Sequence, residues 1–192
     1  TLAKADTENW WIEGKFYESV KDNFLVATLE MPDPRFKNSV IVMLENDKKG
    51  AWGLAINKPI GAIPLGKLID LSEYSEIEKK DLINEKIQIY WGGPVGQKVM
   101  IIHSKDYKNE NTIKFDSFFI TSDYKTLFKI AENKGPKKKL VIIGVSSWGE
   151  GQLEGEMERD DWMLSEIDEN IIFEKDNEKK WEIAISKGFR RL

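Results

Sequence analysis

The sequence lacks cysteine altogether and contains a single histidine, His103. Without cysteine the chain forms no disulfide, no zinc–thiolate site and no cysteine nucleophile. With one histidine, any Ser-His-Asp triad or metal–histidine site has to include His103. No metal site and no cofactor site is predicted.

Long apolar runs and a strong charge imbalance are also missing. No run approaches the roughly 20 apolar residues that span a bilayer. The net charge of −4 and the isoelectric point near 5.3 argue against broad electrostatic attraction to nucleic acid or to anionic lipid. We therefore expect neither nucleic acid nor a membrane as partner, and we expect a cytoplasmic location.

The apolar content is sufficient for a sizeable core. Hydrophobic residues make up 41% of the 192 residues and aromatic residues 11%, which excludes a disordered chain. We expect an N-terminal arm over residues 1–22 and a single domain over residues 23–192. The arm carries four aromatic side chains, so part of it is expected to pack on the domain: Trp10, Trp11, Phe16 and Tyr17.

Short β-branched or apolar runs bounded by turn residues predict strands along the chain. The turn NDKKG at 46–50 separates two such runs and predicts a β-hairpin over 39–56. The strand–helix–strand pattern over 117–145 predicts a βαβ unit with parallel strands and a right-handed crossover. The predicted strands cover 24–28, 39–45, 51–56, 86–91, 99–103, 113–121 and 137–145.

Helices are predicted at five places. Pro64 stands at a first helical position before Leu65, Leu68 and Ile69, and a charged segment follows at 72–84. Ser122 is expected to cap a helix that ends near residue 135. The remaining helices are predicted over 151–159 and over 177–189, the latter with Gly188 as its C-terminal cap. Together with the strands they indicate a mixed β-sheet with peripheral helices, an α+β or mixed α/β fold.

The segment WGEGQLEGEM at 148–157 concentrates glycines and glutamates. Leu153 and Met157 lie four residues apart, which favours a helix with a solvated acidic face over a divalent-metal site. The glycines and Trp148 predict a tight connection leaving the strand at residue 145. Ser146 and Ser147 precede it, but the G-x-S-x-G nucleophile pattern fails, so a turn of small residues is favoured.

Three further features have two interpretations each. His103 ends an apolar strand and is either a buried histidine bonded to backbone, which we favour, or a general base. Gly92 and Gly93 are too few for a phosphate loop and favour a tight turn beside another backbone. The lysines at 137–139 favour a solvated surface over a nucleic-acid contact.

Four separated motifs, taken in order, resemble the YqgE/AlgH family of bacterial proteins. They are DPRF-x-x-SV at 33–40, G-L-x-I-N-K-P at 53–59, GGPV at 92–95 and W-G-x-G-Q-L-E at 148–154. Leu29 and Ser147 depart from the family's pattern, which carries proline and glycine there. The resemblance implies a mixed-sheet or barrel-like α+β core with peripheral helices. It also implies a transcriptional-regulator label, although no helix-turn-helix or basic recognition helix is predicted.

Three functions are open at this point. The first is a non-enzymatic cytoplasmic regulatory or adaptor domain that acts through a protein partner or a small ligand. The second is a hydrolase that uses His103 or a glutamate of 150–158, and the third is a DNA-binding regulator. For the first, three loops are expected to form one groove, and the candidate binding residues are Asn57, Gly92, Gly93, His103, Trp148, Gln152 and Glu154.

Overall fold

The computed structural model describes residues 19–69 and 82–189. The aromatic residues of the predicted arm and the predicted helix at 72–84, up to residue 81, lie outside these ranges. Near the first described residue, Val20 is buried, and its backbone N–H donates to the side chain of Asn46 at 3.2 Å. The division into an arm and one domain stays a prediction.

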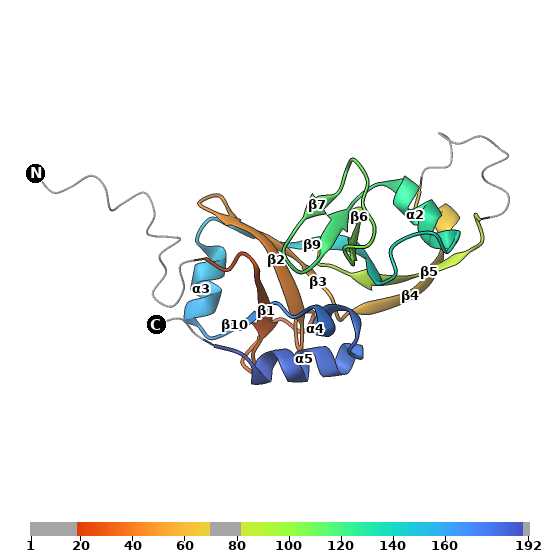
Figure 1. Cartoon of the computed structure of the whole chain (residues 1–192). Helices are drawn as coiled ribbons and strands as arrows, with labels where there is room; N and C mark the ends of the chain where they lie inside the picture. The colour runs from red at the N-terminus through yellow and green to blue at the C-terminus, as the bar shows by residue number, and fades with distance from the viewer. Residues whose placement is uncertain (1–18, 70–81, 190–192) are drawn as a thin grey trace, which may run out of the picture.

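Ten strands and four α-helices make up the described part of the chain (Figure 1). The strands are β1 (Asn23–Ala27), β2 (Val40–Asp47), β3 (Gly50–Ala55), β4 (Pro59–Pro64), β5 (Lys86–Trp91), β6 (Val95–His103), β7 (Ile113–Lys114), β8 (Phe119–Thr121), β9 (Lys139–Gly149) and β10 (Trp162–Glu166). The helices are α2 (Tyr124–Ala131), α3 (Gln152–Glu158), α4 (Glu169–Phe173) and α5 (Asn177–Ser186), with a 3₁₀ turn η1 (Leu65–Lys67). No described helix is long and apolar enough to cross a bilayer.

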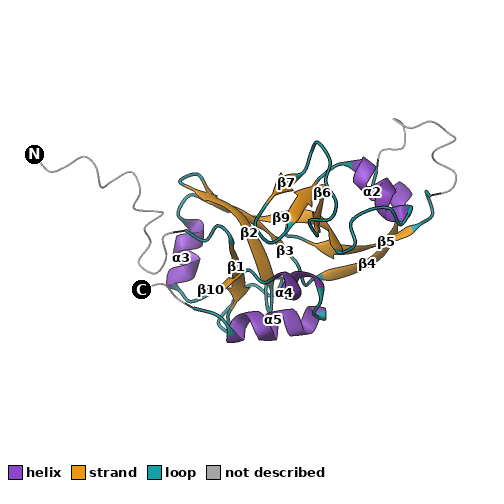
Figure 2. Ribbon diagram, in the orientation of Figure 1, coloured by secondary structure: helices purple, strands orange, loops and turns teal. Residues whose placement is uncertain are grey.

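The strands form one curled sheet in the order β10-β1-β2-β3-β9-β6-β8-β7. Off this path, β5 pairs with β9 and β4 pairs with β5. All pairs are antiparallel except β5 with β9. Figure 2 shows the curl as a half-barrel of strands, with α3 near one end, α4 and α5 along one side and α2 at the opposite end. This confirms the α+β fold with a barrel-like core and peripheral helices.

Strand β9 belongs to both halves of the sheet. Its first half pairs with β5 and β6, and its second half, from Ser146 to Gly149, pairs with β3. Strands β3 and β5 therefore meet end to end beside β9, and Gly92 lies at the meeting point. The Gly92 carbonyl accepts from Ala55 N at 3.0 Å, and the Gly92 N–H donates to Ile143 O at 2.8 Å.

Glycine is required at this meeting point. A Cβ at Gly92 would lie 2.3 Å from the backbone oxygen of Gly144. Gly93 has a φ of 152° and Gly144 a φ of 77°, conformations that other residues rarely adopt. The tight turn predicted at Gly92 and Gly93 is therefore a crossing of two backbones.

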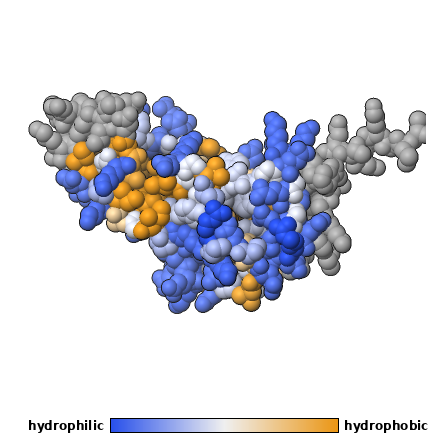
Figure 3. Space-filling model, turned by 180° about the vertical axis from the view of Figure 1, so that it is seen from behind, coloured by the Kyte–Doolittle hydropathy of each residue, from blue (hydrophilic) through white to orange (hydrophobic). Residues whose placement is uncertain are grey.

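Both faces of the first half of the sheet are covered, and so alternate residues of its strands enter different cores. Phe24 and Val26 pack with Ile171 and Ile172 of α4 and with Ala184 of α5. Their neighbours Leu25 and Ala27 pack on the other face with Leu153 and Met157 of α3, among others. A third cluster joins β5, η1 and α2. Figure 3 shows an apolar patch on the surface seen from behind, and Ile60 of β4 is 54% exposed.

Several local predictions are confirmed and others are wrong. The hairpin of β2 and β3 and the helix over 152–158 are present. Strands β8 and β9 are parallel to each other, but β6 lies between them. Pro64 ends the unpredicted strand β4, and only η1 follows it, because residues 59–64 pair with β5.

Three predicted ends also change. Strand β9 continues through Ser146 to Gly149 because β3 pairs with it there, so Ser146 and Ser147 form no turn. The tight connection to α3 is present, but it comes at Glu150 and Gly151 and not after residue 145. Asp123, not Ser122, caps α2 by accepting from Thr126 N. Gly188 follows α5 without a positive φ; its lack of a side chain leaves room for Met163 Sδ, 2.0 Å from where a Cβ would be.

We expect Gly92→Ala to lower the free energy of unfolding by about 3 kcal/mol, because the new methyl group would overlap the Gly144 carbonyl. Gly149→Ala is the matched control, since nothing lies within 4 Å of its added Cβ, and it should change stability by less than about 0.5 kcal/mol. Urea unfolding of both variants measures the difference. Equal stabilities would contradict the close crossing.

Candidate functional site

The loop before β2 is held in place by Asn57. The Asn57 side chain accepts from Val40 N at 2.9 Å and donates to Asn38 O at 2.7 Å. Within the loop, Asp33 accepts from the backbone and the guanidinium of Arg35. The arginine and aspartate of the first motif thus shape a turn, and the asparagine of the second motif fixes that turn to the sheet.

This turn carries Phe36 into a row of aromatic rings. The Phe36 ring lies 5.4 Å from that of Trp91 and 5.6 Å from that of Trp162, and Trp162 lies 5.9 Å from Trp148. Gly92 follows Trp91 directly and accepts from the hydroxyl of Ser146 at 2.9 Å. All four motifs therefore meet around one junction of β3, β5 and β9.

Within WGEGQLEGEM, Glu156 is the glutamate that makes the most side-chain hydrogen bonds. It was not among the site residues predicted from the sequence. Its Oε2 accepts from the indole N–H groups of Trp148 at 2.8 Å and of Trp162 at 2.7 Å. Its Oε1 accepts from Gln152, whose own Oε1 accepts from Gly149 N. The carboxylate therefore ties α3 to β9 and β10, and Trp148 and Gln152 serve this tie.

Glu154 lies apart from this tie. It is half-buried on α3, and burial raises its pKa above the ordinary value. Within residues 19–69 and 82–189, no three histidine, aspartate or glutamate side chains gather as metal ligands do.

His103 is fully buried at the end of β6. Its Nδ1 lies 2.9 Å from Ser104 O and its Nε2 lies 2.8 Å from the Thr121 hydroxyl. Burial lowers its pKa below the ordinary value, so the ring is neutral near pH 7. Both nitrogens are already hydrogen-bonded inside the protein, as in the structural interpretation of this residue.

A large hollow lies on the other side of the Asn57 turn. This hollow, the Lys180 cavity, has a volume of about 1030 Å³ and lies between α5, β4 and the ends of β5 and β9. Its lining consists of Asn38, Asn57, Lys58, Pro59, Tyr90, Lys139, Leu140, Phe173, Lys175, Asp176, Asn177, Glu178, Lys180, Trp181 and Glu182.

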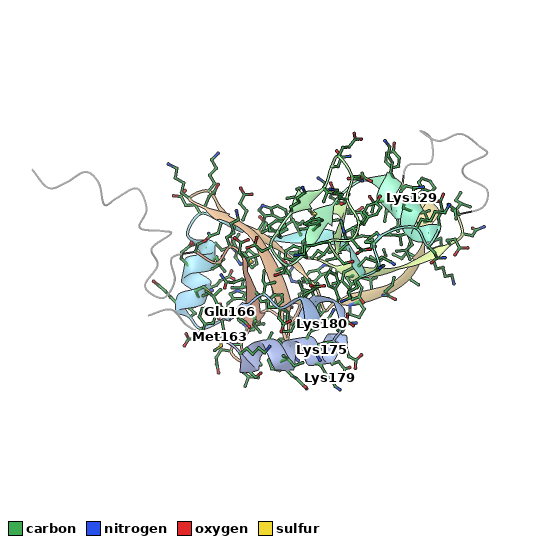
Figure 4. All side chains as sticks on the ribbon, viewed as in Figure 1. Lys129, Met163, Glu166, Lys175, Lys179 and Lys180 are labelled. Carbon is green, nitrogen blue, oxygen red and sulfur yellow. The ribbon has the colours of Figure 1, made fainter. Side chains whose placement is uncertain are left out.

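Lys180 is the unusual member of this lining because it is only 2% exposed. Its Nζ donates to Ile56 O at 3.2 Å and lies 5.7 Å from the centre of the Tyr90 ring. Burial lowers the pKa of Lys180 to about 8 and also lowers that of Lys58. Lys180 points from α5 toward the strands, whereas the exposed Lys179 points away from them (Figure 4).

The residues proposed from sequence are only partly brought together. Asn57 lines the Lys180 cavity, whereas Trp148 lines a separate hollow of about 320 Å³ beside Trp52 and Val95. Gly92 and Gly93 lie between the two as buried backbone. Their role in binding stays a prediction.

The sequence reasoning missed Lys180 and Trp181. One signal was available: Lys180 and Ala184 are four residues apart and thus share a helix face, and Ala184 is buried.

Comparison with known proteins finds similar proteins in bacteria. A family model described as AlgH-like (DUF179) matches residues 24–189. The chain belongs to the AlgH-like family. A UPF0301 protein of Methylococcus capsulatus is 35% identical over 164 residues, 84% of this chain and 87% of that protein. A UPF0301 protein of Jannaschia sp. is 35% identical over 173 residues, 88% of each chain.

Two solved structures share the fold. The solution structure of the AlgH protein from Pseudomonas aeruginosa superposes with a TM-score of 0.70 at 28% identity and covers 88% of each chain. A crystal structure of protein DIP2367 from Corynebacterium diphtheriae gives a TM-score of 0.62 at 18% identity, covering 92% of this chain and 91% of that one. The matched family region contains the motif junction and the Lys180 cavity.

Replacing Glu156 tests the tie between α3 and the sheet. We expect Glu156→Gln to lower the free energy of unfolding by about 2 kcal/mol, because an amide offers one oxygen where a carboxylate bonds two indoles and Gln152. Thermal unfolding and near-ultraviolet circular dichroism of the tryptophans measure it. Glu158→Gln, at an exposed position of the same helix, is the control, and an equal effect there would refute the tie.

Lys180 should make stability depend on pH. Between its folded pKa of about 8 and its ordinary value of 10.5, the unfolded chain holds a proton that the folded chain has lost. Stability therefore rises with pH in this window, by about 3 kcal/mol. The charged and titratable groups facing the same cavity are Lys58, Tyr90, Lys139, Lys175, Asp176, Glu178 and Glu182.

The measurement compares wild type with Lys180→Met by urea unfolding from pH 7 to 10.5. The stability difference should move in favour of wild type as the pH rises, and Lys179→Met should track wild type. A difference that stays constant with pH would show that Lys180 is not held with a lowered pKa.

Proposed function

We propose that this protein is a non-enzymatic cytoplasmic regulatory domain that binds a small ligand in the Lys180 cavity. The observation that carries the proposal is the buried ammonium of Lys180 inside a cavity of ordinary ligand size. Burying a charged amine is unfavourable unless something pairs with it. A protein that needed only a filled core would be more stable with an apolar side chain there.

Asn57, which lines the cavity, connects α5 to the turn before β2. Asn57 donates to Asn38 O in the motif turn and lies 3.4 Å from Asn177 O at the start of α5. A ligand that moves α5 would thus act on the turn and on the aromatic row behind it. This favours a regulatory domain in which the exposed residues of the turn, Arg35, Lys37 and Asn38 among them, form the surface that a protein partner would sense.

The hydrolase alternative has less support. His103 has both ring nitrogens bonded and is closed off from solvent, and a base has to reach its substrate within hydrogen-bond distance. Of the acidic segment, Glu156 is bonded to two indoles and Gln152. Turnover of chromogenic ester, amide or phosphate substrates that is lost in His103→Ala would nevertheless contradict the proposal.

The test is a screen of small compounds of mixed charge by ¹H–¹⁵N NMR. We expect binders to shift the Trp181 indole N–H and the Asn57 amide, which line the cavity, and to raise the melting temperature. The Trp148 indole is the internal control because it lines a different hollow. Compounds that shift Trp148 but leave the cavity signals unchanged, or a screen with no cavity binder, would overturn the proposal.

A further inference from the structure

We propose that the ligand of the Lys180 cavity is a small organic monocarboxylate, whose carboxylate pairs with the ammonium of Lys180 while its apolar part lies against Tyr90 and Trp181. This inference rests on the proposed function and names the ligand class. Four observations carry it: the unused donors of Lys180, the charge of the cavity, the start of α5 and the aromatic walls.

The Lys180 ammonium has more donors than the described protein satisfies. It carries three N–H groups, and its one hydrogen bond among the described residues is to Ile56 O at 3.2 Å. The Tyr90 ring at 5.7 Å adds only a cation–π contact. Lysine is almost never fully buried without a partner, so the remaining donors call for an acceptor, and an anion is the strongest one.

The charge of the lining limits the ligand to a single negative charge. Four lysines and three carboxylates line the cavity, which leaves one net positive charge. A monocarboxylate neutralises this charge, whereas a phosphate dianion would leave an excess negative charge among the three carboxylates. The residues are Lys58, Lys139, Lys175 and Lys180 against Asp176, Glu178 and Glu182.

The start of α5 adds donors in the same place. Asp176 is the N-cap of this ten-residue helix, but its side chain makes no capping hydrogen bond. The first backbone N–H groups of a helix have no partner within the helix and favour an anion. Asp176, Asn177 and Glu178 all line the cavity, so the uncapped end of the helix borders it together with Lys180.

Aromatic walls supply the apolar part of the site. Tyr90, Phe173 and Trp181 line the cavity together with Leu140. The Trp181 indole donates to Ala27 O at 2.7 Å, which fixes the orientation of its ring. A flat apolar group packs well against such rings, so a carboxylate on an aromatic or short aliphatic body suits the site.

Benzoate is the probe, with benzyl alcohol as the neutral analogue and phenyl phosphate as the dianion. By NMR titration at pH 7 we expect benzoate to shift Trp181 with a dissociation constant of about 1 mM. Benzyl alcohol and phenyl phosphate should each bind at least about tenfold more weakly. Equal binding of benzyl alcohol, tighter binding of phenyl phosphate or no benzoate binding would overturn the inference.

Matched variants locate the charge. Lys180→Met should weaken benzoate binding by about tenfold or more, and Lys179→Met, on the exposed side of the same helix, should leave it unchanged. If Lys180→Met does not fold, Lys58→Met, at a half-buried lysine of the same cavity, should weaken binding instead. Unchanged benzoate affinity in the folded variant used would refute the inference.

The two proposals fail in different ways. If uncharged compounds of the screen shift Trp181 and Asn57 while benzoate does not, the cavity is a ligand site of another class and only the monocarboxylate is refuted. If neither benzoate nor any screened compound shifts the cavity signals, both proposals are refuted.

Discussion

The whole structure depends on one strand, β9, being shared by both halves of the sheet. Strand β9 can pair with β5 and then with β3 along the same edge only where those two strands meet end to end. That meeting requires two backbones to approach closer than any side chain allows, at Gly92 and Gly144. The curl of the half-barrel and the position of each motif follow from this crossing.

The family motifs around the crossing are mainly structural, which explains why no reaction could be derived from them. Arg35 and Asp33 shape a turn, Asn57 fixes that turn, and Glu156 bonds two tryptophans. A carboxylate with three donors on it is a strong tie between elements, but it has little capacity left for a substrate. The polar groups that remain available for a ligand lie in the Lys180 cavity, next to Asn57.

The sequence predicted those elements whose local pattern and tertiary surroundings agree. Strands β1, β2 and β3 are apolar runs with clear turns between them, so their existence was predictable. Strand β4 was missed because Pro59, Gly61 and Pro64 disfavour a strand, and only pairing with β5 makes it one. The extension of β9 likewise depends on β3, a distant partner that no local window contains.

The candidate site was less predictable for a related reason. Asn57 was identified through a motif, but Lys180 looks like any solvent-facing lysine of a helix, since lysine is mostly exposed in proteins. Only the packing of α5 on the sheet turns it inward, into a cavity that Asn57 joins to the motif turn. The chain as a whole has a net charge of −4, whereas the lining of this cavity carries one net positive charge. Because Asn57 links both sides, a ligand that neutralises this amine would stabilise α5 and the turn together.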